Sequence, residues 1–474
     1  MNQNLALADN PHDASRDAKA ARLHIELGNA LLAQGALVGA AANFRRVLSV
    51  QPTHWVARMQ LARVLKLSTH YDAAIGLLQS LVAEQPGDAA VHKELGRVHF
   101  ARRQLADALE SFQHALTLNP DDADVHHWLA NIEELRGNAE ASQRHFQQAV
   151  ALNPLLRVPG VKSPADFSVL LLFAHGDANT PPMTLVRMAP YDSYFLLLAT
   201  SVESDVQRLQ SQVDLVVNLI SDVDQAREIL PAAAALVDRL GLPVVNHPRT
   251  IMKTSRESVS TLLSGIPSCR VPRVQYYSAN ELTAAIDADQ LRQFSLPFLA
   301  RVAGTHGGHD FEKIEALPAL ARFVAQHPDA NFYLTEYVDY QSADGFFRKY
   351  RFIFVGGEIL PYHLAIGNGW KVHHSTTDMA NQPWMQQEEA AFLDDPASVF
   401  QPRHYATLRS IQQIIGLDYF GIDCAIDRQG NVVVFEINAT MLVHRDNASF
   451  AYKTPHIDRI KTAFDAMLTK MARP

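Results

Sequence analysis

The stretch VVVFEINATMLVH, from Val432 to His444, holds the residues on which the interpretation of this 474-residue sequence depends. Its valines, together with Phe435 and Ile437, predict a buried β-strand. Glu436 and Asn438 lie inside that strand, two positions apart. Because successive side chains of a strand point to opposite faces, we expect these two polar groups on the same face.

A second strand precedes this one and is expected to pair with it. The segment FGIDCAIDRQGNVVVFEIN, Phe420–Asn438, predicts a β-hairpin with a turn at residues 428–431. Asp423 would then lie beside Glu436 and Asn438. Two carboxylates and one amide oxygen are ligands that Mg²⁺ prefers, with waters and nucleotide phosphates completing the octahedron. The alternative, a buried hydrogen-bond network, is disfavoured because two buried carboxylates without a cation repel each other.

A glycine-rich loop upstream of the hairpin indicates a phosphate site. The segment SLPFLARVAGTHGGHD, residues 295–310, predicts a strand that continues directly into the loop. Arg301 on the strand could reach a phosphate covered by the backbone amides of Gly304, Gly307 and Gly308. A glycine-rich stretch by itself also fits an ordinary turn, so the phosphate interpretation depends on Arg301.

Four prolines mark an internal repeat in the first third of the chain. Pro52, Pro86, Pro120 and Pro154 follow one another at intervals of 34 residues. Small residues where two helices of a hairpin would cross, and large ones eight positions before each proline, keep the same phase. These residues are Gly28, Ala62, Gly96 and Ala130, and Phe44, Leu78, Phe112 and Phe146. The pattern resembles the tetratricopeptide repeat (TPR) family, which implies a solenoid of stacked helical hairpins.

Arrays of this family present the first helix of each hairpin on a concave face, where a peptide or another helix can lie. Six polar residues are expected to point inward and bind a peptide: Asn29, Arg63, Lys66, Lys93, Arg97 and Asn131. The alternative is that they are ordinary solvated helix residues. Ile25 occupies a position where carboxylate-binding repeats carry lysine, so that pattern is not reproduced position by position, and peptide binding of some kind is the main inference.

The motifs of the second half, in their order, resemble the ATP-grasp superfamily, which includes D-alanine:D-alanine ligase, glutathione synthetase and peptide-modifying glutamate ligases. The resemblance covers residues from about 167 to about 469 and is most specific in GID(x)12FEIN, Gly421–Asn438. It implies an ATP-grasp fold in which Asp423, Glu436 and Asn438 bind Mg²⁺. ATP and Mg²⁺ are the expected cofactors.

The resemblance also implies roles for residues outside the hairpin. Arg301 and Arg256 stand where the family carries phosphate-binding lysines, a change that keeps the charge but alters hydration and geometry. The residues implied to bind the phosphates are Arg256, Arg301, Gly304, Gly307 and Gly308. Glu336 and Val338 are implied to bind the adenine, and Asp344 the ribose. Residues implied to act at the transferring phosphate are Arg301 and Arg351.

The acceptor side of the site is expected downstream of the segment KYRFIF. His363, Trp370 and Lys371 are candidate substrate contacts, with packing between subdomains as the alternative for Trp370 and Lys371. A base for an amine is expected among a few of the 21 histidines. The candidates are His306, His309, His363, His373 and His374.

Together these features predict an ATP-dependent carboxylate–amine ligase. The family moves the γ-phosphate onto a carboxylate, and an amine or amino-acid co-substrate then attacks the acyl phosphate, releasing ADP and phosphate. The repeat array would recruit a peptide or small protein as the substrate. Two alternatives remain: a nucleotide-binding TPR scaffold protein without turnover, and an ATP-dependent phosphotransferase on the same fold.

Composition limits the class of partner. The formal charge is −8, with 42 basic and 50 acidic residues and no long run of either sign, which argues against nucleic acid and anionic membrane. No leader or membrane-length apolar run is evident, so a cytoplasmic location is expected. Cys269 and Cys424 are far apart in the sequence and are expected to be reduced packing residues. A homodimer is a further partner that the sequence allows.

The fold class expected from these patterns is an α-helical TPR solenoid followed by an ATP-grasp α/β fold. Apolar runs such as SVLLLF, residues 168–173, YFLLLAT, residues 194–200, and VDLVVNLI, residues 213–220, predict buried strands of an α/β layer. The expected parts are a flexible N-terminus at 1–20, four TPR repeats at 21–155, an α/β pre-ATP-grasp subdomain at 164–250, and the ATP-grasp central and C-terminal subdomains at 251–470.

Overall fold

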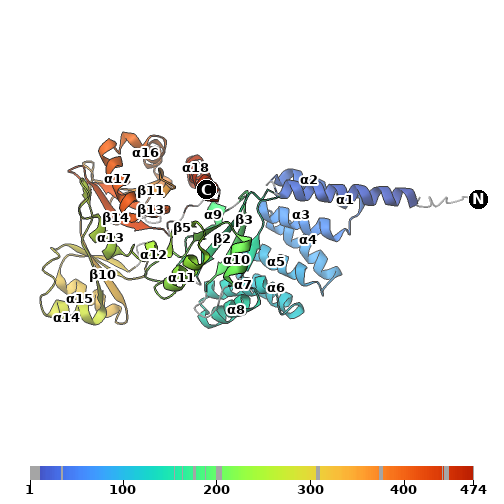
Figure 1. Cartoon of the computed structure of the whole chain (residues 1–474), viewed down its shortest axis with the longest axis horizontal. Coiled ribbons are helices and arrows are strands. Elements are labelled where there is room, and N and C mark those ends of the chain that lie inside the picture. The colour runs from blue at the N-terminus through green and yellow to red at the C-terminus, as the bar shows by residue number, and fades with distance from the viewer. Residues whose placement is uncertain are drawn as a thin grey trace, which may run out of the picture. The chain divides into compact units, whose positions relative to one another are not determined.

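The chain divides into two compact units, which are described separately (Figure 1). The first unit comprises Met1–Asp166 with Met188–Leu197, and the second comprises Phe167–Arg187 with Leu198–Pro474. The computed structural model describes residues 11–33, 36–153, 155–162, 164–174, 178–186, 188–198, 205–305, 310–372, 377–439, 441, 443 and 448–472.

Antiparallel helical hairpins form most of the first unit (Figure 1). Their helices are α1 (Pro11–Ala33), α2 (Leu37–Val50), α3 (Trp55–Leu67), α4 (Tyr71–Glu84), α5 (Ala89–Ala101), α6 (Leu105–Leu118), α7 (Ala123–Leu135) and α8 (Ala139–Leu152). These four hairpins agree with the four repeats predicted at 21–155. Helix α1 begins at Pro11 and so extends into the segment that the sequence predicts to be flexible. Pro154, the last proline of the pattern, lies outside the described residues.

The small residues of the repeat allow the two helices of a hairpin to approach closely. A Cβ atom added at Gly28 would lie 2.7 Å from Cε1 of Phe44, and one added at Gly96 would lie 2.9 Å from Cε1 of Phe112. Both distances are below any ordinary contact, so the phenylalanine rings occupy the space that a side chain would need. The 34-residue alternation of small and large residues is therefore a packing requirement.

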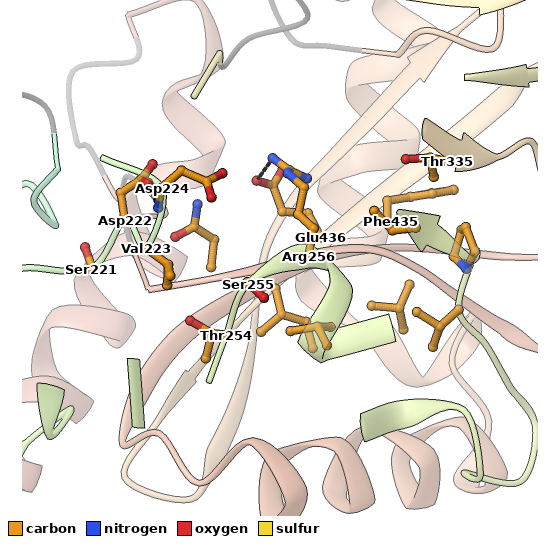
Figure 2. Close-up of a pocket in the computed structure, with 17 residues that line it drawn as sticks. Ser221, Asp222, Val223, Asp224, Thr254, Ser255, Arg256, Thr335, Phe435 and Glu436 are labelled. Carbon is orange, nitrogen blue, oxygen red and sulfur yellow. Dashed lines mark hydrogen bonds and ion pairs between the residues drawn. The ribbon is translucent and has the colours of Figure 1, made fainter. Parts of the chain in front are cut away.

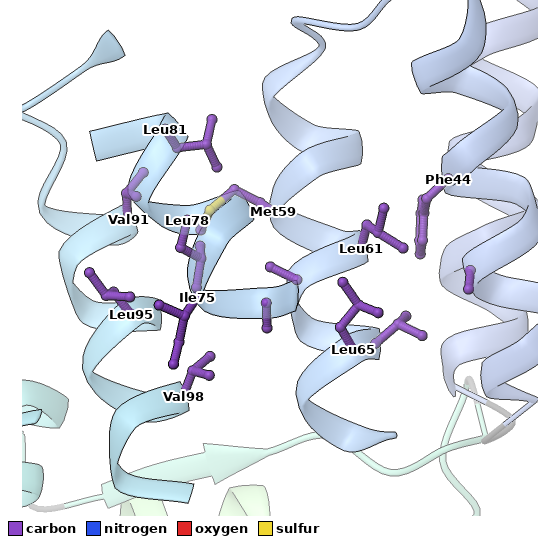
Figure 3. Packing of buried hydrophobic residues seen from close by; sticks show 14 of the residues in the cluster. Phe44, Met59, Leu61, Leu65, Ile75, Leu78, Leu81, Val91, Leu95 and Val98 are labelled. Carbon is purple, nitrogen blue, oxygen red and sulfur yellow. The ribbon is translucent and has the colours of Figure 1, made fainter. Parts of the chain in front are cut away.

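Neighbouring hairpins share one apolar core. Figure 3 shows Phe44, Leu61 and Leu65 on one side of the cluster and Leu78 and Val98 further along it. Such residues contribute about 1.5–3 kcal/mol each when fully buried, so the array is stabilised by contacts between adjacent repeats.

Two strands complete the first unit. Strand β1 (Leu155–Val158) pairs antiparallel with β3 (Asp192–Leu197). Asp192 accepts hydrogen bonds from the Nη2 of Arg157 at 2.7 Å and from the backbone N of Gly160 at 2.9 Å. The sequence predicts the β3 strand within the α/β subdomain at 164–250, whereas the structure groups it with the repeat unit.

The second unit begins with a parallel layer. Strand β4 (Leu215–Asn218) pairs in parallel with β2 (Ser168–Phe173) and with β5 (Val244–Val245). Near-continuous burial of these strands is typical of a parallel sheet covered on both faces. Helices between the strands and after β5 are α9 (Met183–Val186), α10 (Val206–Gln212), α11 (Leu230–Leu240) and α12 (Pro248–Ile251).

A four-stranded sheet follows, in the order β7-β10-β8-β9, with antiparallel pairs throughout. Its strands are β7 (Val274–Ser278), β8 (Phe298–Val302), β9 (Phe311–Ile314) and β10 (Asn331–Glu336). Helices α14 (Ala279–Asp287) and α15 (Leu317–Gln326) pack on it through Leu282, Leu320 and Phe323.

The third sheet is five-stranded, in the order β12-β11-β13-β14-β6. Its strands are β6 (Cys269–Arg270), β11 (Phe347–Val355), β12 (Glu358–Gly367), β13 (Tyr419–Ile426) and β14 (Val432–Asn438). The accompanying helices are α13 (Arg256–Leu263), α16 (Pro383–Asp394), α17 (Pro402–Ile415) and α18 (Thr454–Ala472), with short 3₁₀ helices at Met379–Asn381, Pro396–Ser398 and Ala448–Lys453. Phe352 of β11 contacts Phe392 of α16 and Phe400, so one face of the sheet is covered by an aromatic core.

Asn246 joins the parallel layer to the five-stranded sheet. Its side-chain amide donates to the carbonyl of Tyr419 at 2.6 Å, and its backbone N donates to Asp418 at 3.0 Å. These bonds fix the start of β13 against the end of β5. In the described residues, no helix is both long and apolar enough to cross a membrane. A helical array followed by a mixed α/β region thus agrees with the coarse fold predicted from the sequence.

Candidate functional site

Four polar residues form one row across the five-stranded sheet. Arg351 of β11 is the register partner of His363 of β12 and of Asp423 of β13. Asp423 is in turn the register partner of Glu436 of β14. Directly opposed residues of antiparallel strands point to the same face, and adjacent strands lie about 4.8 Å apart. The structure therefore brings together side chains from two hairpins, β11–β12 and β13–β14, that are distant from each other in the sequence.

The row lies at two irregularities of the sheet. The register between β11 and β12 shifts after Arg351, and the register between β13 and β14 shifts after Asp423. A β-bulge changes the direction of the neighbouring side chain and is often found beside a functional site. The pairing of the predicted hairpin, β13 with β14, is confirmed, and the structure adds the register shift after Asp423.

Asp423 is ionised in the middle of a cationic environment. Its carboxylate accepts hydrogen bonds from Nε and Nη2 of Arg351 at 2.6 and 3.0 Å, and Nζ of Lys349 lies 3.0 Å from its Oδ2. The residue is only 3% exposed. Burial alone would raise the pKa of Asp423, but the charges of Arg351 and Lys349 hold it far below its usual range.

Glu436 is held by a different arginine. The Nη2 of Arg256, at the start of α13, lies 2.8 Å from the Glu436 carboxylate. Burial raises the pKa of Glu436, yet Arg256 and Arg301 together lower it to about 2. Figure 2 shows this ion pair at the centre of a small polar pocket, with Asp222 and Asp224 on one side of it.

Arg301 differs from Arg256 and Arg351 because no described carboxylate forms an ion pair or hydrogen bond with its side chain. Its guanidinium lies 4.2 Å from the centroid of the Phe311 ring. Burial and the nearby Arg256 charge lower the pKa of Arg301 to about 10, so the group stays protonated at neutral pH. A half-buried cation that forms no ion pair with a carboxylate favours the binding of an anion.

One cavity of about 390 Å³ is lined by Asp423 and Glu436, by the cations that contact them, and by Arg301. Among the described residues, its walls carry five cationic side chains and three carboxylates, a surplus of two positive charges. The cations are Arg256, Arg301, Lys349, Arg351 and Lys371, and the carboxylates are Glu336, Asp423 and Glu436. Asn438, the third predicted metal ligand, also lines the cavity. The arrangement is suited to an anionic ligand with several oxygen atoms.

One end of the cavity is aromatic. Phe311 and Tyr337 each lie edge-on to Trp370, with ring centroids 5.2 and 6.3 Å apart. Glu336 and Val338, predicted to hold adenine, line this cavity. Glu336 forms an ion pair with Arg270 at 3.1 Å, so its carboxylate is already partly engaged.

Several predicted site residues do not join this cavity. Asp344 is an exposed loop residue whose carboxylate binds Arg348 at 2.8 Å, and Arg348 also binds Glu388. The structure therefore does not bring Asp344 to the cavity as a ribose ligand. Gly304 is described at φ +76° but is not among the lining residues. The predicted residues that lie outside the described part of the chain are His306, Gly307, Gly308, His309, His373 and His374.

The predicted acceptor residues have two different locations. Trp370 and Lys371 line the cavity, and Nζ of Lys371 donates to the carbonyl of Phe311 at 3.3 Å. His363 lies in the row but is not a lining residue, because its ring is turned towards Glu389 at the free edge of β12.

Lys349 is a site residue that the sequence interpretation missed. It lies two positions before Arg351 on β11, so strand alternation places both on one face. The signal was present in the KYRFIF segment, but only the register with β13 shows that Lys349 reaches Asp423.

The predicted peptide-binding residues of the array have their charges largely compensated. Glu94, which is 2% exposed, lies 3.6 Å from Arg63, 2.9 Å from Lys66 and 2.9 Å from Arg97. Lys93 binds Asp122 at 2.7 Å. Asn29 on α1 and Asn131 on α7 are exposed. Arg63, Lys66, Lys93 and Arg97 therefore do not form a basic surface that would attract acidic peptides.

Known proteins resemble the first unit. A tetratricopeptide repeat family model matches residues 31–97, and a TPR repeat model matches residues 96–134. Among solved structures, MamA 41-end from Desulfovibrio magneticus RS-1 is 27% identical, covers 29% of this chain and 78% of its own, and has a TM-score of 0.27. A thermophilic TPR protein in Thermus thermophilus is 26% identical, covers 28% of this chain and 74% of its own, and has the same TM-score of 0.27. No curated protein matches the chain. The N-terminal helices of this chain are tetratricopeptide repeats.

Proposed function

We propose that the second unit is an ATP- and Mg²⁺-dependent carboxylate–amine ligase of ATP-grasp type, and that the TPR array recruits its peptide or protein substrate. The observation that supports this most is the cavity in which a cationic surplus surrounds two ionised carboxylates on adjacent strands. A cleft that binds an apolar ligand does not need such charges, whereas a site that transfers a phosphoryl group needs them to stabilise the charge of the transition state.

The charge of the cavity suits a nucleoside triphosphate. Arg301 supplies a half-buried cation that forms no ion pair with a described carboxylate, and Arg256 lies close enough to lower its pKa. A triphosphate bound with one Mg²⁺ keeps two net negative charges, which equals the surplus of positive charge on the described walls. The aromatic end around Trp370 would take the base.

The residues also fit a Mg²⁺ ion, on condition that phosphate binds with it. Asp423 and Glu436 are ionised and adjacent, and Asn438 adds an amide oxygen to the same cavity. Each carboxylate is engaged by arginine, so free Mg²⁺ would compete with Arg351, Lys349 and Arg256. Phosphate oxygens would draw these cations away and would complete the ion's oxygen shell. Bound there, the ion would neutralise charge on the transferred phosphate.

The protein groups have distinct tasks in this proposal. Arg256 and Arg301 bind phosphate oxygens from α13 and β8. Arg351 and Lys349 release Asp423 and bind the transferred γ-phosphate instead. Their positive charge then lies where negative charge develops during the transfer. The carboxylate substrate attacks the γ-phosphorus, its oxygen forms the new P–O bond, and ADP leaves.

Peptide recruitment is proposed for the array because tetratricopeptide repeats generally bind proteins. Asn29 and Asn131 remain candidates for contacting a peptide backbone, since both are exposed. The second substrate is proposed to be an amine or an amino acid.

The test uses the full chain with ATP, Mg²⁺, a proteolytic digest of cell extract as the source of carboxylates, and hydroxylamine as a strong neutral nucleophile. Peptide hydroxamates formed together with ADP and phosphate would support the ligase, and mass spectrometry identifies them. AMP with pyrophosphate as the product would contradict it.

Two other outcomes separate the alternatives. Phosphorylated peptides without hydroxamates would indicate a phosphotransferase. Nucleotide binding without any product would indicate a scaffold protein. This is the main alternative, because arginine replaces the family's phosphate-binding lysines.

A further inference from the structure

A buried polar cluster lies at the outer end of the site row, and its residues do not line the cavity described above. Nδ1 of His363 is 2.5 Å from Oε1 of Glu389, which is completely buried. The same oxygen accepts from Nζ of Lys453 at 3.0 Å and from the backbone N of Leu364 at 3.1 Å. Tyr452 donates to Oε2 at 2.6 Å. Glu389 therefore has partners enough without the histidine.

The contacts fix the tautomer of His363. A carboxylate only accepts hydrogen bonds, so a separation of 2.5 Å from Oε1 of Glu389 requires a proton on Nδ1 of His363. Nζ of Lys453 lies 2.9 Å from the same nitrogen, and with Nδ1 protonated it donates to Glu389 instead, at 3.0 Å. Burial, assisted by the charges of Lys453 and Arg351, lowers the pKa of His363 to about 4, so the ring is neutral at physiological pH. Nε2 then carries a lone pair and no proton.

Nε2 of His363 is buried and has no hydrogen-bond partner among the described residues. A buried polar atom without a partner costs about 1–3 kcal/mol, so a purely structural residue at this position is poorly explained. If Glu389 only satisfied the backbone at the free edge of β12, the bonds from Lys453, Tyr452 and the Leu364 amide would be sufficient for it. The lone pair is suited to a donor that arrives with a substrate.

The position of His363 in the row indicates which substrate that is. Glu436, Asp423 and Arg351 follow one another on successive strands, and His363 lies one strand beyond Arg351, on the same face. The nucleotide-binding cations Arg256 and Arg301 belong to the Glu436 end. The register shift after Arg351 lies directly beside His363. The acceptor would therefore approach from the side of His363.

We infer that His363, oriented by Glu389, is the proton acceptor for the amine nucleophile of the ligase reaction. The inference rests on the proposed function. As the amine nitrogen attacks the carbonyl carbon of the acyl phosphate, the C–N bond forms and the bond from carbon to the phosphate oxygen breaks. Phosphate leaves with the electron pair of that bond, and the proton of the attacking nitrogen passes to Nε2 of His363. The resulting imidazolium is stabilised by the Glu389 carboxylate and then releases the proton to solvent.

A weak base is adequate for this step. The attacking nitrogen becomes strongly acidic while the C–N bond forms, so a neutral imidazole with a lowered pKa can accept its proton. Lys453 keeps the ring unprotonated until then.

The experiment compares two nucleophiles in the full chain, with the same digest, ATP and Mg²⁺. Hydroxylamine is neutral and needs no base, whereas a mixture of the standard amino acids supplies ordinary amines. The key variant is His363→Asn, whose side-chain NH₂ can keep the bond to Glu389 but offers no acceptor at the position of Nε2. The ratio of amide to hydroxamate product is expected to fall by a factor of about 10² to 10⁴.

Tyr452→Phe is the matched control, because it removes a hydrogen bond from the same cluster and leaves Nε2 in place. It is expected to keep the wild-type product ratio. An unchanged ratio in His363→Asn, or an equal fall in Tyr452→Phe, would overturn the inference and leave the cluster as a structural support. Absence of hydroxamate and of ADP with the wild-type chain is a different result, because it contradicts the proposed function itself.

Discussion

The two units of this chain use arginine and lysine in opposite ways. In the repeat array, three cations surround the buried Glu94, and two aspartates at the next repeat complete the network. In the cavity of the second unit, cations outnumber carboxylates on the described walls, and Arg301 forms no ion pair with a carboxylate of the described residues. Matched charges hold repeats together, whereas a surplus of charge favours a ligand. The comparison shows that ion-pair partners, more than residue type, distinguish a structural cation from a binding one.

The largest expected effect is on turnover. Glu436→Gln removes one of the two ionised carboxylates and should lower turnover by a factor on the order of 10² or more, because a charge at the phosphate site is lost. ADP release measures it. Glu312→Gln, at an exposed position of β9, is the matched control and should behave like the wild type. Full turnover in a folded Glu436→Gln protein would show that the carboxylates of the cavity are as structural as Glu94.

The next prediction makes one substitution in both units. Arg301→Met should weaken ATP binding by about 1.5–3 kcal/mol, since a charged hydrogen-bond donor is lost. It should destabilise its strand only slightly, because no described carboxylate loses an ion pair or a hydrogen bond and Glu436 keeps its ion pair with Arg256. Arg97→Met should leave ATP binding unchanged and destabilise α5 by about 1–3 kcal/mol, because Glu94 and Asp124 both lose a partner.

Calorimetric titration with ATP and hydrogen exchange of residues 89–101 and 298–302 in the full chain measure the two effects separately. The comparison would fail if Arg301→Met destabilised β8 as much as Arg97→Met destabilises α5. It would also fail if ATP bound both variants equally.

Sequence periodicity predicted what depends on local geometry. The 34-residue spacing gave the repeats because each small residue must face its own large partner, as Gly28 faces Phe44. Strand alternation placed Glu436 and Asn438 on one face, and the hairpin turn placed Asp423 opposite. These features need only the positions of residues within one hairpin.

Contacts between distant segments were not predictable in the same way. Glu94 lies 31 and 28 residues from Arg63 and Lys66, and no pattern in the sequence shows that the three side chains meet. The compensation of these predicted peptide-binding cations by Glu94 was therefore not foreseen. For the same reason the pairing of Asp423 with Lys349 and Arg351 required the observed register of β11 and β13.

A third prediction concerns the acid stability of the array. Burial alone would raise the pKa of Glu94, but Lys66 and Arg97 lower it overall. A carboxylate with a lowered pKa in the folded state stabilises the fold above its unfolded pKa of about 4.3, and this contribution is lost as the pH falls through the folded value. Glu94→Gln should therefore destabilise α5 by about 1–3 kcal/mol at neutral pH and by less in acid. Hydrogen exchange at two pH values measures this, and an equal cost at both would refute the role of the charge.

The smallest expected effect is the salt dependence of peptide capture by the array. Raising the salt from about 0.1 M to about 1 M shortens the screening length from about 10 Å to about 3 Å, which weakens attraction by unpaired surface cations. Since Arg63, Lys66, Lys93 and Arg97 already have carboxylate partners, a captured peptide should be held mainly by shape and by neutral hydrogen bonds. Its affinity should therefore change by roughly twofold or less over this range. Fluorescence anisotropy of a labelled peptide product, measured with the full chain, provides the value. A loss of tenfold or more would mean that a peptide displaces Glu94 and Asp122 from their cations, and the array would then bind by charge as the cavity does.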